Sequence, residues 1–183
     1  MARLSELGID FDHWCFACGR ANPYGLHLDF DVARGRAETT LVSRREHTGY
    51  DGFVHGGIVT ALLDETMGWA IFHQGIWGMT VRITVTFRQP VEPGAELVIT
   101  GTVTKEVRRA VETHGEVRDS SGALLAEADA TFLLMPEERR RELERRYSRI
   151  DEAFAKVKAA VDEEEKEQGE GPLFSRAKRG VRT

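Results

Sequence analysis

The chain is poor in cysteine, with only Cys15 and Cys18, and it lacks long uncharged apolar runs. Two cysteines are too few for a disulfide framework, which favours a reducing compartment. The longest apolar segment, residues 58–72, is interrupted by two acids, so no membrane-spanning segment is expected. The opening "MARLSELGID" lacks the apolar core and the cleavage site of a secretory signal. We therefore expect a cytoplasmic protein that does not enter a membrane.

An excess of positive charge is also missing. The 183 residues include 25 Lys and Arg against 30 Asp and Glu, which gives a net charge of −5 and a pI of about 5.7. A chain of this balance lacks the basic footprint of a nucleic-acid-binding protein, so no nucleic-acid partner is expected. The length suits one domain with an appendage, and it is sufficient for a hydrophobic core without disulfides or metals.

Alternation of apolar and polar residues with period two predicts six strands around one long helix. Residues 80–88, "TVRITVTFR", show the alternation most clearly. The sequence thus predicts an α+β domain in which an antiparallel sheet wraps a central helix at 57–73, and in which the last four strands form a meander. The expected strands are residues 26–32, 36–43, 80–88, 96–107, 110–118 and 124–134.

A change of composition at Pro136 predicts a separate C-terminal helix. Proline followed by Glu137 and Glu138 suits the first turn of a helix and its positive dipole end. Apolar residues then recur at spacings of four and three from Leu143 to Val161, which is typical of a seam between two helices. Packing of this stripe on the domain itself is an equal alternative. The expected organisation is an N-terminal lid or extension (1–25), a main domain (26–135), a C-terminal amphipathic helix (136–168) and a flexible tail (169–183).

The central helix is apolar on all sides and yet carries Asp64 and Glu65. A carboxylate within such a helix loses hydration, so it must be paired, hydrogen-bonded, protonated or exposed to a wet crevice. Successive helical residues point about 100° apart, so only one of the two faces a given crevice. We expect Asp64 to be the functional one, with a purely structural cap or salt bridge as its alternative. Glu65 competes for the role, or pairs with Arg82, or lies at a dimer seam.

Gly56 and Gly57 open this helix. Without side chains they allow another molecule close to the N–H groups of the helix start, where the partial positive charge can polarise a carbonyl group. Asp64 lies seven residues after Gly57, about 10 Å along the same helix, which is too far for both to act on one carbonyl carbon. The helix of a second subunit could supply the missing group. The geometry therefore predicts an obligate dimer with sites shared between subunits.

Three segments resemble one family, the PaaI-like branch of the hotdog-fold acyl-CoA thioesterases. They are "CFACGRANPYGLHLDF", "HGGIVTALLDE" and "VRDSSGALLAEADATFLL", and the similarity runs from Cys15 to Met135. The resemblance implies a hotdog fold, in which one continuous sheet wraps the two central helices of a homodimer. A homotetramer is equally compatible with it. No separate cofactor is implied, because coenzyme A is part of the substrate.

The resemblance also implies roles for individual residues. Asp64, nine positions after the motif histidine, would act as general base on water or as nucleophile. The N–H of Gly57 would polarise the thioester carbonyl, and His55 would position that loop and the thioester. Thr80, ten residues before a proline, would orient the water or Asp64.

The resemblance is weaker at the positions that would bind the substrate. Some members carry Asn or Gln at the position of Gly49, so the role of that amide is either absent here or taken over by His47 or Asp51. Gly56 is expected to allow the substrate close to the helix start. The family's nucleotide-binding region includes the hairpin "KEVRRA", which makes Arg108 and Arg109 candidates for the phosphates of coenzyme A. A solvated charged turn explains the two arginines equally well.

The segment "HWCFACG" predicts no metal site, because one Cys-x-x-Cys with His13 does not complete tetrahedral zinc coordination. We expect its cysteines to pack under the N-terminal lid. The function expected is hydrolysis of an acyl-CoA thioester to a free acid and coenzyme A. The alternatives are an enoyl-CoA hydratase or dehydratase, whose His-Phe-Pro-Gly element is missing at 51–55, and a non-catalytic acyl-CoA-binding or scaffold protein.

Overall fold

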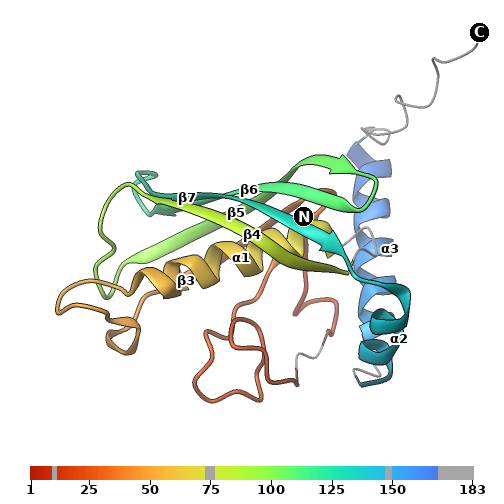
Figure 1. Ribbon diagram of the computed structural model, residues 1–183, viewed down its shortest axis with the longest axis horizontal. Helices are drawn as coiled ribbons and strands as arrows, with labels where there is room; N and C mark the ends of the chain where they lie inside the picture. Colours follow the sequence, from red (N-terminus) through yellow and green to blue (C-terminus); the bar gives the residue numbers. More distant parts are fainter. Residues whose placement is uncertain (10–11, 73–76, 147–149, 169–183) are drawn as a thin grey trace, which may run out of the picture.

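The computed structural model describes residues 1–9, 12–72, 77–146 and 150–168. Within these residues, seven strands form one antiparallel sheet in the order β1-β2-β3-β5-β6-β7-β4, and the long helix α1 lies along one face of it (Figure 1). The strands are β1 (Ala2–Arg3), β2 (Asp31–Ala33), β3 (Arg36–Val42), β4 (Gly78–Phe87), β5 (Glu96–Val107), β6 (Ala110–Asp119) and β7 (Leu124–Leu134). The helices are the 3-10 turn η1 (Arg45–His47), α1 (Gly56–Phe72), α2 (Glu137–Arg146) and α3 (Ile150–Gln168).

Helix α1 packs directly against two glycines of the sheet. Gly101 on β5 and Gly115 on β6 are cross-strand partners. A Cβ atom at Gly101 would lie 2.7 Å from the Thr66 carbonyl oxygen, and one at Gly115 would lie 3.1 Å from Leu63 Cδ2. Only glycine allows the helix this close to the strands. The predicted enclosed helix is confirmed, and its buried residues are Val59, Leu62, Leu63, Thr66, Met67, Trp69, Ala70 and Ile71.

The first predicted strand, 26–32, is wrong in extent. Strand β2 begins only at Asp31. The N–H groups of Leu26 and Leu28 instead donate to the carbonyls of residues 16 and 17 at 2.8 and 2.9 Å, and His27 has a φ of 54° that interrupts the extended backbone. The alternation reports burial correctly, because Leu26 and Leu28 are buried, but it does not identify the hydrogen-bonding partner.

The predicted four-strand meander is also wrong. Strands β5, β6 and β7 form a meander, but β4 pairs with β7 at the edge of the sheet and β3 occupies the place beside β5. The reason is the exit of the chain from α1. The N–H of Met135, just after β7, donates to the Trp77 carbonyl just before β4 at 2.7 Å, so the chain re-enters the sheet where β7 ends.

Strand β4 is an edge strand with an irregularity near its start. The pairing register with β7 shifts between Thr80 and Arg82, which leaves Val81 as an extra residue in a β-bulge. Met79, Val81 and Phe87 are exposed on this strand. A ten-residue edge with exposed apolar side chains is the kind of edge that native proteins cover by pairing.

The predicted C-terminal helix is two helices, α2 and α3, on either side of residues 147–149, which lie outside the described residues together with the tail at 169–183. Val157 and Val161 of α3 are buried, and α3 contacts β1 and β2 at the end of the sheet (Figure 1). For these two residues the structure supports packing on the domain itself. None of the described helices is both long and apolar enough to cross a membrane.

Candidate functional site

The His-Gly-Gly loop is tied together by its own histidine. The N–H of Gly57 donates to His55 Nδ1 at 2.8 Å, and the N–H of His55 donates to the carbonyl of His47 at 2.8 Å. The ring of His55 is exposed. The Gly57 N–H that is expected to polarise a carbonyl is therefore bound to His55 Nδ1 in this structure.

His47 supports this loop from inside. Its side chain is buried, and its Nδ1 accepts a hydrogen bond from the N–H of Arg44 at 3.1 Å. Burial and, after it, the charge of Arg44 lower the pKa of His47, so its ring is neutral near pH 7. His47 thus stabilises the conformation of the loop. Asp51, the other replacement considered for the family amide, is exposed.

A cavity of about 410 Å³ opens beside the start of α1. Gly56 forms part of its wall, and a Cβ atom there would lie 3.2 Å from Cζ of Phe87. The mainly apolar lining suits an apolar group held next to the helix start. The lining residues are Phe53, Val54, Gly56, Val59, Phe87, Arg88, Gln89, Pro90 and Val91.

Asp64 and Thr80 come together as the sequence reasoning expects. The hydroxyl of Thr80 donates to Asp64 Oδ1 at 2.7 Å, and Asp64 is half-buried. Regular alternation from Ile83, which packs against the core, would point Thr80 away from α1. The bulge at Val81 reverses this, and it therefore aims the hydroxyl at the helix.

Arg108 and Arg109 lie elsewhere. Both are exposed in the turn between β5 and β6, and the carbonyl of Arg109 accepts a hydrogen bond from the N–H of Leu134 at 3.0 Å. This turn is at the end of the sheet where α1 finishes, and the 17-residue helix is about 25 Å long. A single chain therefore does not bring these arginines next to Gly57.

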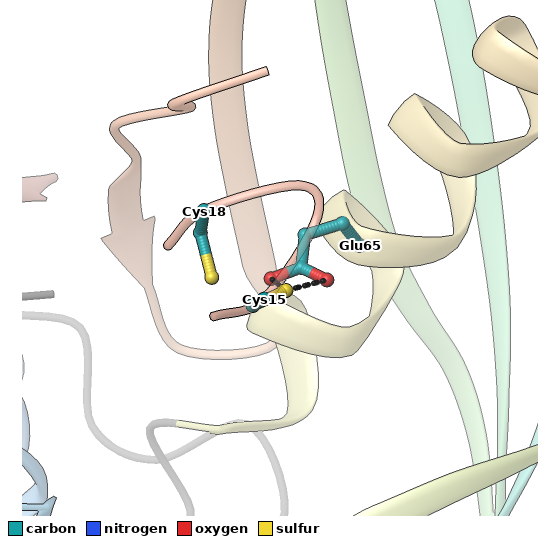
Figure 2. Close-up of side chains that lie close together, drawn as sticks. All are labelled: Cys15, Cys18 and Glu65. Atoms are coloured by element: carbon teal, nitrogen blue, oxygen red, sulfur yellow. Dashed lines mark hydrogen bonds between the residues drawn. The ribbon is translucent and has the colours of Figure 1, made fainter. Parts of the chain in front are cut away.

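Glu65 faces a different environment from Asp64. Its carboxylate oxygens lie 3.7 and 3.8 Å from the sulfur of Cys15 (Figure 2). The Nε1–H of Trp69 also donates to this carboxylate at 3.2 Å. Burial of the carboxylate and the nearby Cys15 raise the pKa of Glu65 to about 7. The pairing with Arg82 that was considered from the sequence is therefore not found, and the structure brings Glu65 against the N-terminal segment.

Sequence reasoning missed the convergence of Cys15, Cys18 and Glu65. Their ligand atoms all lie within 4.8 Å of one another. Hydrogen bonds from the side chain of Cys18 and from the backbone of Cys18 and Ala17 lower the pKa of Cys15 to about 5, whereas the Cys15 contact and burial raise the pKa of Cys18. Two features, "HWCFACG" and an acid in an apolar helix, were visible, but 50 residues separate them and no spacing rule connects them.

Comparison with known proteins finds similarity to the same family that the sequence motifs resemble. A sequence model of the thioesterase superfamily matches residues 51–126. The acyl-coenzyme A thioesterase THEM4 of Xenopus laevis is 31% identical over 114 residues, which cover 60% of this chain and 51% of the relative. Human acyl-coenzyme A thioesterase 13 is 28% identical over 103 residues, which cover 55% of this chain and 74% of the relative.

A solved structure shows the same fold. The Escherichia coli PaaI protein of the phenylacetic acid degradation operon superposes with a TM-score of 0.57 at 20% identity, over 59% of this chain and 83% of that one. The chain spans only about half the length of the frog relative. The part of the chain that matches the thioesterase superfamily includes the His-Gly-Gly loop, α1 and strands β4 to β6. Residues 51–126 thus match the thioesterase superfamily, and the chain has the hotdog fold.

Proposed function

We propose that this protein is a cytoplasmic acyl-CoA thioesterase that works as a homodimer or a larger assembly of dimers. The observation that carries the proposal is the hydrogen bond from Thr80 to the half-buried Asp64, beside the open edge formed by β4. A carboxylate fixed by one hydroxyl and reachable from an edge is suited to accept a proton from water. The two relatives named as acyl-coenzyme A thioesterases support the choice of substrate.

The reaction uses Asp64 as general base. Its carboxylate takes a proton from water while the water oxygen forms a bond to the thioester carbonyl carbon. The N–H of Gly57, released by the ring of His55, donates to the carbonyl oxygen as negative charge develops there. The intermediate collapses with cleavage of the C–S bond, and the proton held by Asp64 passes to the departing sulfur. The products are a free acid and coenzyme A.

The base and the donor come from two subunits. Along one α1, Gly57 and Asp64 are about 10 Å apart, so they do not serve the same carbonyl. The exposed edge of β4 is available for pairing with the same edge of a second copy, which would lay the two α1 helices side by side. In an antiparallel pair, the hairpin with Arg108 and Arg109 of one subunit approaches the helix start of the other. These arginines are then placed for the phosphates of coenzyme A.

The test is release of thiol from a panel of aryl-, short-chain and medium-chain acyl-CoA substrates. Wild type should hydrolyse at least one of them, and Asp64→Asn should lose this activity while it keeps the secondary structure and the oligomeric state of wild type. Asp129→Asn is the matched control, because Asp129 is exposed on β7 and pairs with His114. Full activity of Asp64→Asn would refute the assignment. Tight acyl-CoA binding by wild type without hydrolysis would favour a binding protein instead.

A further inference from the structure

We propose that Cys15, Cys18 and Glu65 form a site for one zinc-like divalent cation, which fastens the N-terminal segment to α1. The proposal is independent of thioester hydrolysis, because none of these three side chains is assigned a part in that reaction. Thiolates and carboxylates are two of the three ligand types that zinc takes from proteins.

The distances fit a common tetrahedral centre. With Zn–S of about 2.3 Å and Zn–O of about 2.1 Å, a sulfur and an oxygen on one tetrahedral zinc lie about 3.6 Å apart. The sulfur of Cys15 lies 3.7 and 3.8 Å from the two carboxylate oxygens of Glu65. Cys18 completes the cluster within 4.8 Å (Figure 2). Three protein ligands leave one coordination position, which water can occupy.

The loop that carries the cysteines is shaped to turn both sulfurs to one side. The N–H of Gly19 donates to the carbonyl of Cys15 at 3.0 Å, which closes a turn between Cys15 and Gly19. A Cβ atom at Gly19 would lie 2.1 Å from the carbonyl oxygen of His13, so only glycine fits this turn. The turn therefore brings Cys15 and Cys18 together, and their sulfur atoms lie within 4.8 Å of each other.

The carboxylate is oriented in the same way. The indole Nε1–H of Trp69, one turn along α1, donates to Oε1 of Glu65 at 3.2 Å. The ring of Trp69 is itself held by stacking on Phe30, with ring centroids 5.3 Å apart. A ligating carboxylate fixed by a second residue is typical of metal sites.

The charge of the cluster also calls for a cation. Two thiols and a carboxylate, all acidic groups, meet where Cys18 is buried and Cys15 and Glu65 are half-buried, and burial disfavours negative charge. In the part of the chain that the structure describes, no lysine or arginine forms a salt bridge with Glu65. A divalent cation compensates the charge and satisfies all three groups at once. This explains why an apolar helix carries Glu65 next to Asp64.

The test is metal binding by the full chain, stripped with a chelator under a reductant and then titrated with zinc or with cobalt(II). We expect one ion per chain and a cobalt spectrum with thiolate charge-transfer bands and the visible bands of tetrahedral coordination. Zinc should raise the thermal midpoint of wild type. Glu65→Gln should weaken binding at least about tenfold while it keeps the charge-transfer bands, and Cys15→Ser should weaken binding similarly and lose about half of their intensity.

Glu96→Gln, an exposed change on β5, is the matched control and should bind metal as wild type does. The wild-type cobalt spectrum decides the question even if a variant fails to fold. Cobalt bound without thiolate bands, no uptake of metal, or equal affinity of folded Glu65→Gln and wild type would each overturn the proposal. A reduced chain that takes up no zinc and re-forms a Cys15–Cys18 disulfide would overturn it in favour of a redox pair.

Discussion

Asp64 and Glu65 are adjacent in the chain, but they lie on two faces of α1 with different surroundings. Asp64 is next to the open edge of the sheet, where Thr80 from the β4 bulge donates to it. Glu65 is turned toward the N-terminal segment, against Cys15 and Trp69, and its pKa is raised to about 7. The comparison shows that a 100° turn of the helix is enough to give two carboxylates different chemistry.

The two sides differ in what reaches the carboxylate. On the Asp64 side the carboxylate is half-buried next to the exposed Thr80 of the edge strand β4, so water can approach it from that edge. On the Glu65 side the neighbours are fixed side chains of the same chain. We therefore assign turnover to the first side and attachment of the N-terminal segment to the second.

The largest expected effect is on turnover and separates the two sides. Removing a general base costs about 10²- to 10⁴-fold, so Asp64→Asn should lower kcat/KM by that factor. The decrease in kcat/KM caused by Glu65→Gln should be at least tenfold smaller, because Glu65 affects the reaction only through the position of α1. Steady-state thiol release by both variants and by Asp129→Asn measures this. The comparison fails if Glu65→Gln is the more damaging of the two.

The second effect is on the pH dependence of stability in the metal-free chain. Glu65 titrates near its ordinary value of 4.5 when unfolded and at about 7 when folded. The folded state then holds an extra proton between these values, so this group makes the free energy of unfolding fall as pH rises from about 4.5 to about 7. The loss can reach about 3 kcal/mol.

The wild-type minus Glu65→Gln difference in unfolding free energy isolates the contribution of the Glu65 carboxylate together with its coupling to Cys15 and Cys18, because the more distant groups titrate alike in both chains. Urea denaturation in chelator and reductant at several pH values gives the difference. It should decrease across the window, whereas a flat or rising difference would show that the Glu65 carboxylate is not held in its protonated form by burial.

The smallest effects come from removing the hydrogen-bond donor on each side. Thr80→Val should lower kcat/KM about tenfold, which corresponds to about 1.4 kcal/mol of the activation barrier, because Asp64 loses the hydrogen bond that orients it. The change in stability should be smaller than that of Trp69→Phe, because Thr80 is exposed. Trp69→Phe should lower the free energy of unfolding by about 1–2 kcal/mol. The controls are Thr84→Val on the same strand and Trp14→Phe, whose side chain is exposed. Equal stability losses for Thr80→Val and Trp69→Phe would remove the distinction between the sides.

Much of the fold could be predicted from periodicity. The helix, the strands from Glu96 to Leu134 and the enclosure of α1 follow from patterns that report burial. Strand order did not follow, because period two indicates which face is buried and not which strand is the neighbour. For that reason the place of β4 beside β7 and the short β2 had to come from the structure.

The candidate site was predictable in part. The family spacing selected Asp64 and Thr80, and the structure joins them, although the bulge at Val81 that turns Thr80 inward has no sequence pattern of its own. The hydrogen bond from Gly57 to His55 was missed because it depends on the loop conformation. The meeting of Cys15 with Glu65 was missed because tertiary packing alone brings these residues together.

The most direct test of the shared site is a mixture of two inactive homodimers, one carrying Gly57→Pro and the other Asp64→Asn. Proline removes the N–H at Gly57 and is tolerated in the first turn of a helix. If Gly57 of one subunit works with Asp64 of the other, each mixed dimer contains one intact site, and random exchange of subunits should restore about a quarter of wild-type activity. No recovery after verified subunit exchange would show that each site lies within one chain, and it would contradict the account.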